Sequence, residues 1–170
     1  MALSKKKRTL IIALFAMVAA AGLLVLSASR IVAPVPPMFD ESVTLEQASA
    51  AADANGQFVL AVATFDYCIG CQNLKRNTLS DDRVESWVSD HARPVYLKMG
   101  RDDDAIEALR TRCREAGIEA KLNGLPMVVL LKDGTPVAAR TGFVDVPGFV
   151  KFLDAGTTPA EAAPAETPTS

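Results

Sequence analysis

The chain has few of the residues that build metal sites. Among its 170 residues there are one histidine, His91, and three cysteines. Two of the cysteines stand in the motif Cys68-Ile69-Gly70-Cys71, which is also half of many zinc sites. A zinc site needs two further soft ligands, and only His91 and Cys113 remain, neither in a paired motif. We therefore predict no bound metal.

Positive charge is also scarce outside the amino end. Residues 1–30 contain five of the 18 basic residues and no acidic residue, so the rest of the chain has 13 basic against 20 acidic residues and a net charge of −7. A nucleic-acid-binding domain carries a basic patch that neutralises phosphates. The composition therefore excludes nucleic acid as a partner.

The amino end has a different composition. Residues 1–8 are a basic n-region with three lysines and an arginine, and an uncharged apolar run extends from Leu10 to Leu26. With its small flanking residues the segment 9–28 is about as long as a bilayer-spanning helix. A cleavable signal peptide has a shorter apolar core, and Ser27-Ala28-Ser29 resembles its exit site. We interpret 9–28 as a transmembrane anchor, with a cleaved signal peptide as the alternative.

Both interpretations give the same orientation. The basic cluster stays in the cytoplasm, and the chain from Arg30 onward lies outside. We expect a single-pass protein of the inner membrane with its C-terminal domain in the periplasm, or a soluble periplasmic domain after cleavage. Three cysteines are an odd number for such an oxidising compartment.

Three further segments follow from composition. Residues 29–40 include Ala33-Pro34-Val35-Pro36-Pro37 and form an extended, Pro-rich linker. Residues 41–154 are the folded unit, and no internal repeat occurs. Residues 155–170 have almost no large apolar side chain, so we expect a disordered tail.

The motif at 68–71 is the strongest indication of chemistry. It follows an apolar run, residues 58–64, that predicts a buried strand, and it opens a predicted helix that ends near Thr78. The dipole and free N–H groups at a helix N-terminus stabilise a thiolate on the first cysteine. The two-residue spacer lets the second cysteine close a disulfide. This arrangement predicts a redox-active pair that needs no other cofactor.

The remaining pattern alternates helices and strands. Ile106, Leu109 and Cys113 fall on one apolar face of a helix, which predicts a buried thiol. Strands alternating with helices and a final hairpin predict a small α/β fold with parallel and antiparallel strands. Besides strand 58–64 and the helix from the motif to about 78, we expect helices at 45–52 (N-capped by Thr44), 83–88, 105–114 and 146–153, and strands at 94–99, 127–131 and 136–140.

These features together resemble the thioredoxin superfamily over residues 44–154. The resemblance rests on the strand–motif–helix unit at 65–71, on Gly124-Leu125-Pro126 before a strand, and on the hairpin Lys132-Asp133-Gly134-Thr135 followed by Thr141-Gly142-Phe143. Together with residues 77–84 and 141–145, the second segment is most similar to the C-terminal periplasmic domains of DsbD-type thiol:disulfide interchange proteins.

The resemblance implies a fold and a mechanism. The fold is α/β, the thioredoxin fold, with a central mixed sheet flanked by helices. Cys68 becomes the exposed nucleophile and Cys71 the buried resolving thiol. Pro126 is expected in a cis peptide beside them, and Leu125 offers its backbone to an extended substrate. The implied partners are protein thiols and disulfides and a membrane electron donor.

The chain departs from the family pattern around the motif. Tyr67 replaces the usual tryptophan, and we expect its ring to pack over the site. Val62 replaces a buried carboxylate that helps to deprotonate the resolving thiol. Asp66 is the one acid close to the motif, expected to cap the loop or to face solvent. The uncharged Ile69-Gly70 spacer lacks the histidine that is typical of oxidants, which favours a reductant.

Two functions remain open at this level. The first is a membrane-anchored periplasmic thiol–disulfide oxidoreductase. The alternative is a thioredoxin-fold binding or chaperone module whose cysteine pair is a static disulfide. The intact pair at a helix start favours the first.

Overall fold

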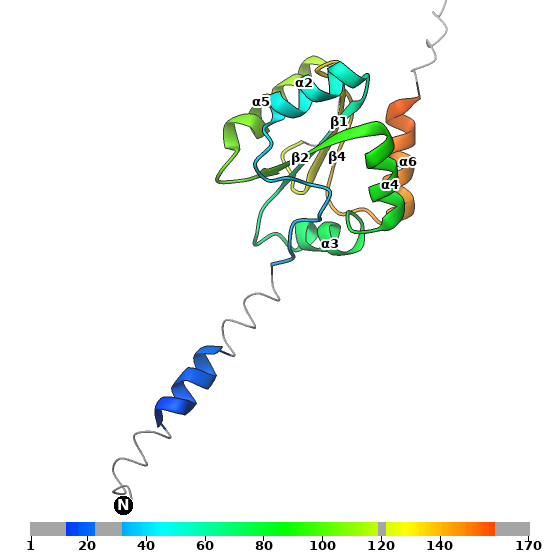
Figure 1. Ribbon diagram of the computed structural model, residues 1–170. Helices are drawn as coiled ribbons and strands as arrows, with labels where there is room; N and C mark the ends of the chain where they lie inside the picture. Colours follow the sequence, from blue (N-terminus) through cyan, green and yellow to red (C-terminus); the bar gives the residue numbers. More distant parts are fainter. Residues whose placement is uncertain (1–12, 23–31, 119–121, 159–170) are drawn as a thin grey trace, which may run out of the picture. The chain divides into compact units, whose positions relative to one another are not determined.

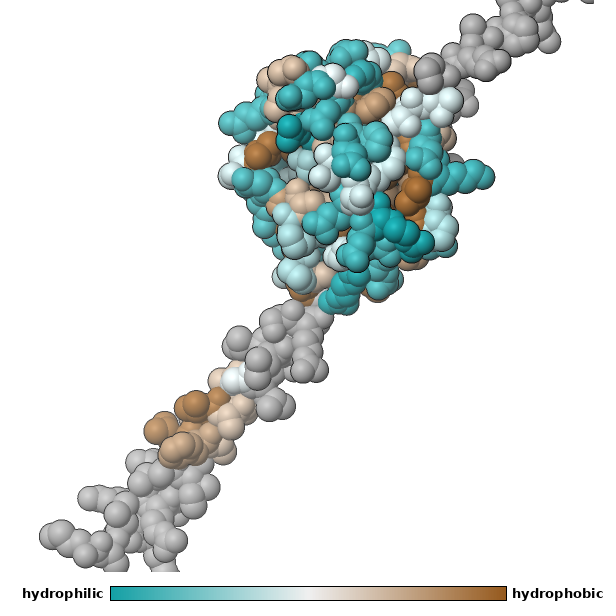
Figure 2. Space-filling view, turned by 45° about the vertical axis from the view of Figure 1, so that its right-hand side comes forward, coloured by the Kyte–Doolittle hydropathy of each residue, from teal (hydrophilic) through white to brown (hydrophobic). Residues whose placement is uncertain are grey.

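The computed structural model describes residues 13–22, 32–118 and 122–158 (Figure 1). The chain divides into two compact units, Met1–Pro34 and Val35–Ser170. In the first unit, residues 13–22 are helical and largely hydrophobic (Figure 2). Across the described ranges, no helix is long and apolar enough to cross a membrane. The rest of the predicted anchor at 9–28, and the whole n-region, lie outside the described residues.

The second unit alternates helices and strands as predicted. Thr44 caps the first helix through a reciprocal pair of hydrogen bonds with Gln47. The elements are α2 (Leu45–Asn55), β1 (Phe58–Thr64), α3 (Ile69–Asn77), α4 (Asp82–His91), β2 (Ala92–Lys98), α5 (Asp103–Glu115), β3 (Met127–Lys132), β4 (Thr135–Thr141) and α6 (Val146–Thr157).

The strands form one mixed sheet in the order β2-β1-β3-β4. β1 pairs with β2 in parallel, with Val62 opposite Tyr96, and with β3 antiparallel. The hairpin β3–β4 completes the sheet. β1 is therefore an inner strand, and six of its seven residues are buried. The predicted mixed sheet flanked by helices is confirmed.

Alternation along β1 divides the core into two layers. Leu60 and Val62 face the layer that includes side chains of α3, α4 and α6. Val59, Ala61 and Ala63 face the layer that includes side chains of α2 and α5. Figure 1 shows α2 and α5 on one side of the sheet and α4 and α6 on the other. Both faces of the sheet are thus covered.

Several element boundaries differ from the sequence-based predictions, and two of the differences depend on tertiary contacts. β2 begins at Ala92 rather than at 94, because Ala92 and Arg93 continue the parallel pairing with β1. α6 continues to Thr157, so three residues assigned to the tail are helical. At Gly156 an added Cβ would lie 2.8 Å from a methyl carbon of Leu130, so the last turn of α6 packs closely on the sheet. Residues 159–170 of the predicted tail lie outside the described residues.

Candidate active site

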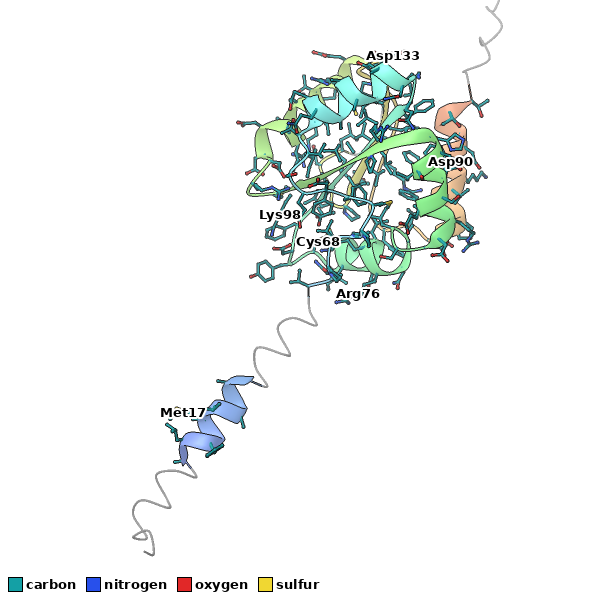
Figure 3. The ribbon with its side chains drawn as sticks, viewed as in Figure 1. Met17, Cys68, Arg76, Asp90, Lys98 and Asp133 are labelled. Atoms are coloured by element: carbon teal, nitrogen blue, oxygen red, sulfur yellow. A yellow bond between two sulfur atoms is a disulfide. The ribbon has the colours of Figure 1, made fainter. Side chains whose placement is uncertain are left out.

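The cysteine pair lies where the chain passes from β1 into α3. Cys68 is the N-cap of α3, and the backbone N–H of Cys71 donates a hydrogen bond of 3.1 Å to its Sγ. The two cysteines form a disulfide. A sulfur at this position faces the positive end of the helix dipole and receives an N–H donor, and both stabilise a thiolate. In Figure 3 the label of Cys68 lies beside the helix that Figure 1 labels α3.

The two sulfurs differ in their access to solvent. Cys68 is half-buried, whereas Cys71 has no exposed surface. A disulfide-bonded partner can therefore reach Cys68 but not Cys71. This asymmetry suits a pair in which one thiolate attacks a partner and the other attacks the resulting mixed disulfide.

The segment Leu125–Pro126 lies beside the cysteine motif, and a third segment at Gly142 binds to it. The peptide bond between Leu125 and Pro126 is cis, as predicted. The Sγ of Cys68 lies 3.7 Å from the carbonyl oxygen of Leu125, and an added Cβ at Gly70 would lie 3.4 Å from Cδ of Pro126. Gly142, with φ of 84°, donates its N–H to the carbonyl oxygen of Pro126 at 2.8 Å. The hydrogen bond from Gly142, which directly follows β4, thus holds the backbone of Pro126 in place beside the disulfide.

Exposed apolar side chains accompany the disulfide. Tyr67 and Ile69, on either side of Cys68, are 80% and 79% exposed. Phe65 and Phe143 are also exposed, and Phe143 directly follows Gly142. The ring of Tyr67 stands edge-on to that of Phe65 with centroids 5.6 Å apart. Tyr67 therefore projects from the surface, whereas the sequence-based expectation was a ring packed over the site.

Asp66, two residues before Cys68, makes polar contacts with Lys98 and Gln72. Its carboxylate forms an ion pair with Nζ of Lys98 at 2.6 Å and is partly exposed. We had expected Asp66 to cap the loop or to face solvent, and it faces solvent only in part. The carboxylate raises the pKa of Lys98 through this hydrogen bond. Its carbonyl oxygen accepts a hydrogen bond from Nε2 of Gln72 at 2.6 Å. Both contacts hold the loop that precedes Cys68.

Beneath this loop lies a buried hydrogen bond between β1 and β2. The hydroxyl of Thr64 donates to the hydroxyl oxygen of Tyr96 at 2.5 Å. Both residues are almost completely buried. Burial raises the pKa of Tyr96, so this phenol stays neutral at physiological pH.

The sequence analysis missed one buried cation. Lys75, on α3, is only 2% exposed. Burial lowers its pKa, partly offset by the charge of Asp66. Lys75 follows Cys71 by four residues and so lies on the same helix face, but this spacing does not by itself predict that a lysine is buried. Val62, at the position where the family has a carboxylate, is fully buried within an apolar cluster.

The third cysteine lies elsewhere. Cys113 is a free, fully buried thiol on α5. Its neighbours include Leu109 and Ile106 in the opposite core layer from Val62. Burial alone raises the pKa of its thiol. The predicted buried, apolar environment of Cys113 is confirmed.

Comparison with known proteins places this geometry in a family. The family model described as a thioredoxin-like domain matches residues 45–157. A search of curated protein sequences gives no match. The residues matched by the family model cover all nine elements from α2 to α6, including the cysteine pair and the cis proline.

Solved structures have the same fold at low sequence identity. A thioredoxin from Thermus thermophilus is 22% identical, with a TM-score of 0.54, over 71% of this chain and 85% of that one. The C-terminal domain of Neisseria meningitidis DsbD, in the reduced form, is 21% identical, with a TM-score of 0.52, over 69% of this chain and 98% of that one. A DsbH oxidoreductase is 13% identical, with a TM-score of 0.53, over 74% and 86%. At such identities the likeness concerns the fold.

Proposed function

The chain belongs to the thioredoxin-like domain family and is a thiol–disulfide oxidoreductase, and from this premise we propose that it is a membrane-tethered reductant of protein disulfides in the periplasm. The observation that carries the proposal is the asymmetry of the pair, with Cys68 accessible at a helix N-cap and Cys71 buried behind it. The reaction uses the disulfide of these two cysteines and no other redox group.

The reaction has two exchange steps. The thiolate of Cys68 attacks one sulfur of the partner disulfide, and the other partner sulfur leaves as a thiolate. The thiolate of Cys71 then attacks Sγ of Cys68, the bond to the partner breaks, and the partner's second sulfur leaves with the electron pair. The partner gains two electrons, and the pair ends as the disulfide. A membrane electron donor would then reduce the pair again.

The apolar rim favours a polypeptide partner. Tyr67, Ile69, Phe65 and Phe143 offer exposed apolar surface on the segments around the cysteine motif and Gly142, and aromatic side chains are typical of recognition surfaces. We propose that apolar side chains flanking the partner's cysteine contact this rim. The backbone of Leu125 would pair with the extended partner segment beside the disulfide.

The direction of electron flow rests on the spacer. Ile69 and Gly70 bring neither charge nor histidine next to Cys68, so the thiolate lacks the extra stabilisation that makes a pair oxidising.

Trapping tests the exchange function. The variant Cys71→Ser should accumulate a mixed disulfide between Cys68 and its partner in cells, and mass spectrometry then identifies the partner. Cys68→Ser is the matched control, because it removes the attacking sulfur and leaves Cys71 buried. If the trapped species is absent and the purified native protein turns over no disulfide substrate, the pair is a static disulfide and the module is a binding or chaperone domain.

Fractionation tests the tether. An uncleaved anchor should leave a full-length product of about 18.1 kDa in the membrane fraction. Protease should reach it only after the outer barrier is opened. A soluble product that begins near Arg30 would identify the segment as a cleaved signal peptide, and the exchange chemistry would still operate in the same compartment.

A further inference from the structure

The resolving step needs a proton acceptor for Cys71. Its thiol is fully buried, and burial raises a thiol pKa because it disfavours the charged form. Val62 supplies no carboxylate. The buried polar side chains of β1 and β2, Thr64 and Tyr96, are hydrogen-bonded to each other, and both stay neutral.

Lys75 lies one helical turn beyond Cys71. Residues four apart on a helix share a face, with Cβ atoms about 6 Å apart, and helical side chains lean toward the N-terminus. Lys75 therefore extends toward the turn that holds Cys71. Both residues are buried, at 2% and 0% exposure. The side chain of Lys75 and the sulfur of Cys71 thus share one buried face of α3.

The charges around Lys75 come from several elements. Asp66, before α3, and Glu41, before α2, favour its charged form, whereas Lys98 at the end of β2 and Arg76 on α3 oppose it. Asp66 already pairs with Lys98 at 2.6 Å, so much of its charge is compensated. Burial is the largest influence and lowers the pKa of Lys75. A lowered pKa means that Lys75 loses its proton more readily than a surface lysine does.

We propose that Lys75 accepts the proton of Cys71 when the mixed disulfide is resolved, in the role that a buried carboxylate has in relatives. The proposal rests on the exchange function proposed above. The proton moves from Cys71 Sγ to the neutral amine of Lys75. The thiolate attacks Cys68 Sγ, and the electron pair of the broken bond leaves on the partner sulfur. The ammonium of Lys75 returns its proton to solvent or to the departing thiolate.

A two-phase exchange reaction tests the proposal. The reduced full-length protein is mixed with dithiobis(nitrobenzoate), a small disulfide whose released thiolate absorbs visible light. Attack by Cys68 releases the first thiolate, and resolution by Cys71 releases the second. In Lys75→Met, at neutral pH, we expect the second phase to slow by about 100-fold, the scale of a lost proton acceptor. The first phase should stay within about twofold of native, because it does not use Lys75.

The pH dependence separates proton transfer from packing. The deficit of Lys75→Met should shrink as the pH rises toward and beyond the thiol pKa, because Cys71 then ionises without help. Lys75→Arg should lose the second phase as Lys75→Met does, because a guanidinium keeps its proton in proteins. Arg76→Gln is the matched control. It removes an exposed cation whose charge is the smallest of the influences on the pKa of Lys75, so both phases should stay within about twofold of native.

Each other outcome overturns a defined claim. An unchanged second phase in Lys75→Met, or a deficit that is equal at every pH, rejects Lys75 as the acceptor. A native rate in Lys75→Arg shows that its charge, not its proton exchange, matters, which also rejects the proposal. If the native protein itself releases only one thiolate, the exchange function fails instead. Should Lys75→Arg not fold, the pH profile of Lys75→Met decides alone.

Discussion

Cys71 and Cys113 are equally buried, with no exposed surface on either, yet their surroundings differ. Cys71 lies in the first turn of α3, bonded to a sulfur at the helix N-cap, with a buried lysine one turn further on. Cys113 lies near the end of α5 among apolar side chains, and its neighbours Arg112 and Arg114 extend along the outside of the helix. Burial alone therefore does not decide what a cysteine does. The position along the helix and the polar groups within reach decide it.

Serine substitution should separate the two cysteines most strongly. Cys71→Ser removes the resolving sulfur, so we expect turnover of a disulfide substrate to fall by more than about 1,000-fold, as for residues that act as one unit. Cys113→Ser should retain turnover. Steady-state reduction of a protein disulfide measures both variants. Comparable losses in both would mean that Cys113 takes part in the exchange.

Alkylation gives the next largest contrast. After reduction at neutral pH, we expect iodoacetamide to label Cys68 at least about 100-fold faster than Cys113, because reaction needs an accessible thiolate and Cys113 becomes accessible only on opening of the fold. Peptide mapping by mass spectrometry over time gives the order. Early labelling of Cys71 or Cys113 would contradict the assigned roles.

An acid at position 62 should speed the resolving step and lower the stability of the fold. Val62 is fully buried and lies between Tyr96 and Val128 in the sheet. Val62→Asp should lower the free energy of unfolding by about 3 kcal/mol, since a polar group there lacks compensation. It should also speed the second thiolate release, because it adds a proton acceptor. Denaturant titration and the two-phase assay measure the two effects, and Val62→Asn, which cannot accept a proton at neutral pH, is the control.

Removing the buried amine should change how stability depends on pH. Lys75→Met takes away a buried group whose pKa is lowered in the folded state. In the native protein the folded-state pKa of Lys75 is lowered, so between that value and the unfolded one the unfolded chain holds more protons, and stability rises with pH. This rise should flatten in Lys75→Met. An equal slope in both proteins would show that the amine titrates as it does in the unfolded chain.

The smallest effect is expected from Cys113→Ala. Removing one buried sulfur from a packed core should cost about 1 kcal/mol and leave exchange unchanged. Burial raises the pKa of Cys113, so above its unfolded pKa the folded state holds the extra proton, and stability falls as the pH rises. Cys113→Ala should lack this alkaline loss. Thermal unfolding across the alkaline range compares the two proteins.

Most of the fold could be predicted from the sequence, because the patterns that indicate helices and strands are local. The apolar run at 58–64 became β1 with the predicted bounds, and Thr44 capped α2 as predicted. The boundary at Ala92 was missed because it depends on pairing with β1, which is a long-range contact. The end of α6 was missed for a similar reason, since its last turn packs on Leu130.

The sequence by itself determined the redox pair, because two cysteines at this spacing, after a strand and at the start of a helix, are typical of a redox-active disulfide. It did not determine what surrounds the pair. That Asp66 binds Lys98, that Tyr67 points outward and that Lys75 is buried behind Cys71 were decided by the tertiary structure. The physical reason is that burial and ion pairing depend on which elements cover a residue, and a lysine on a helix has the same local propensity on either face.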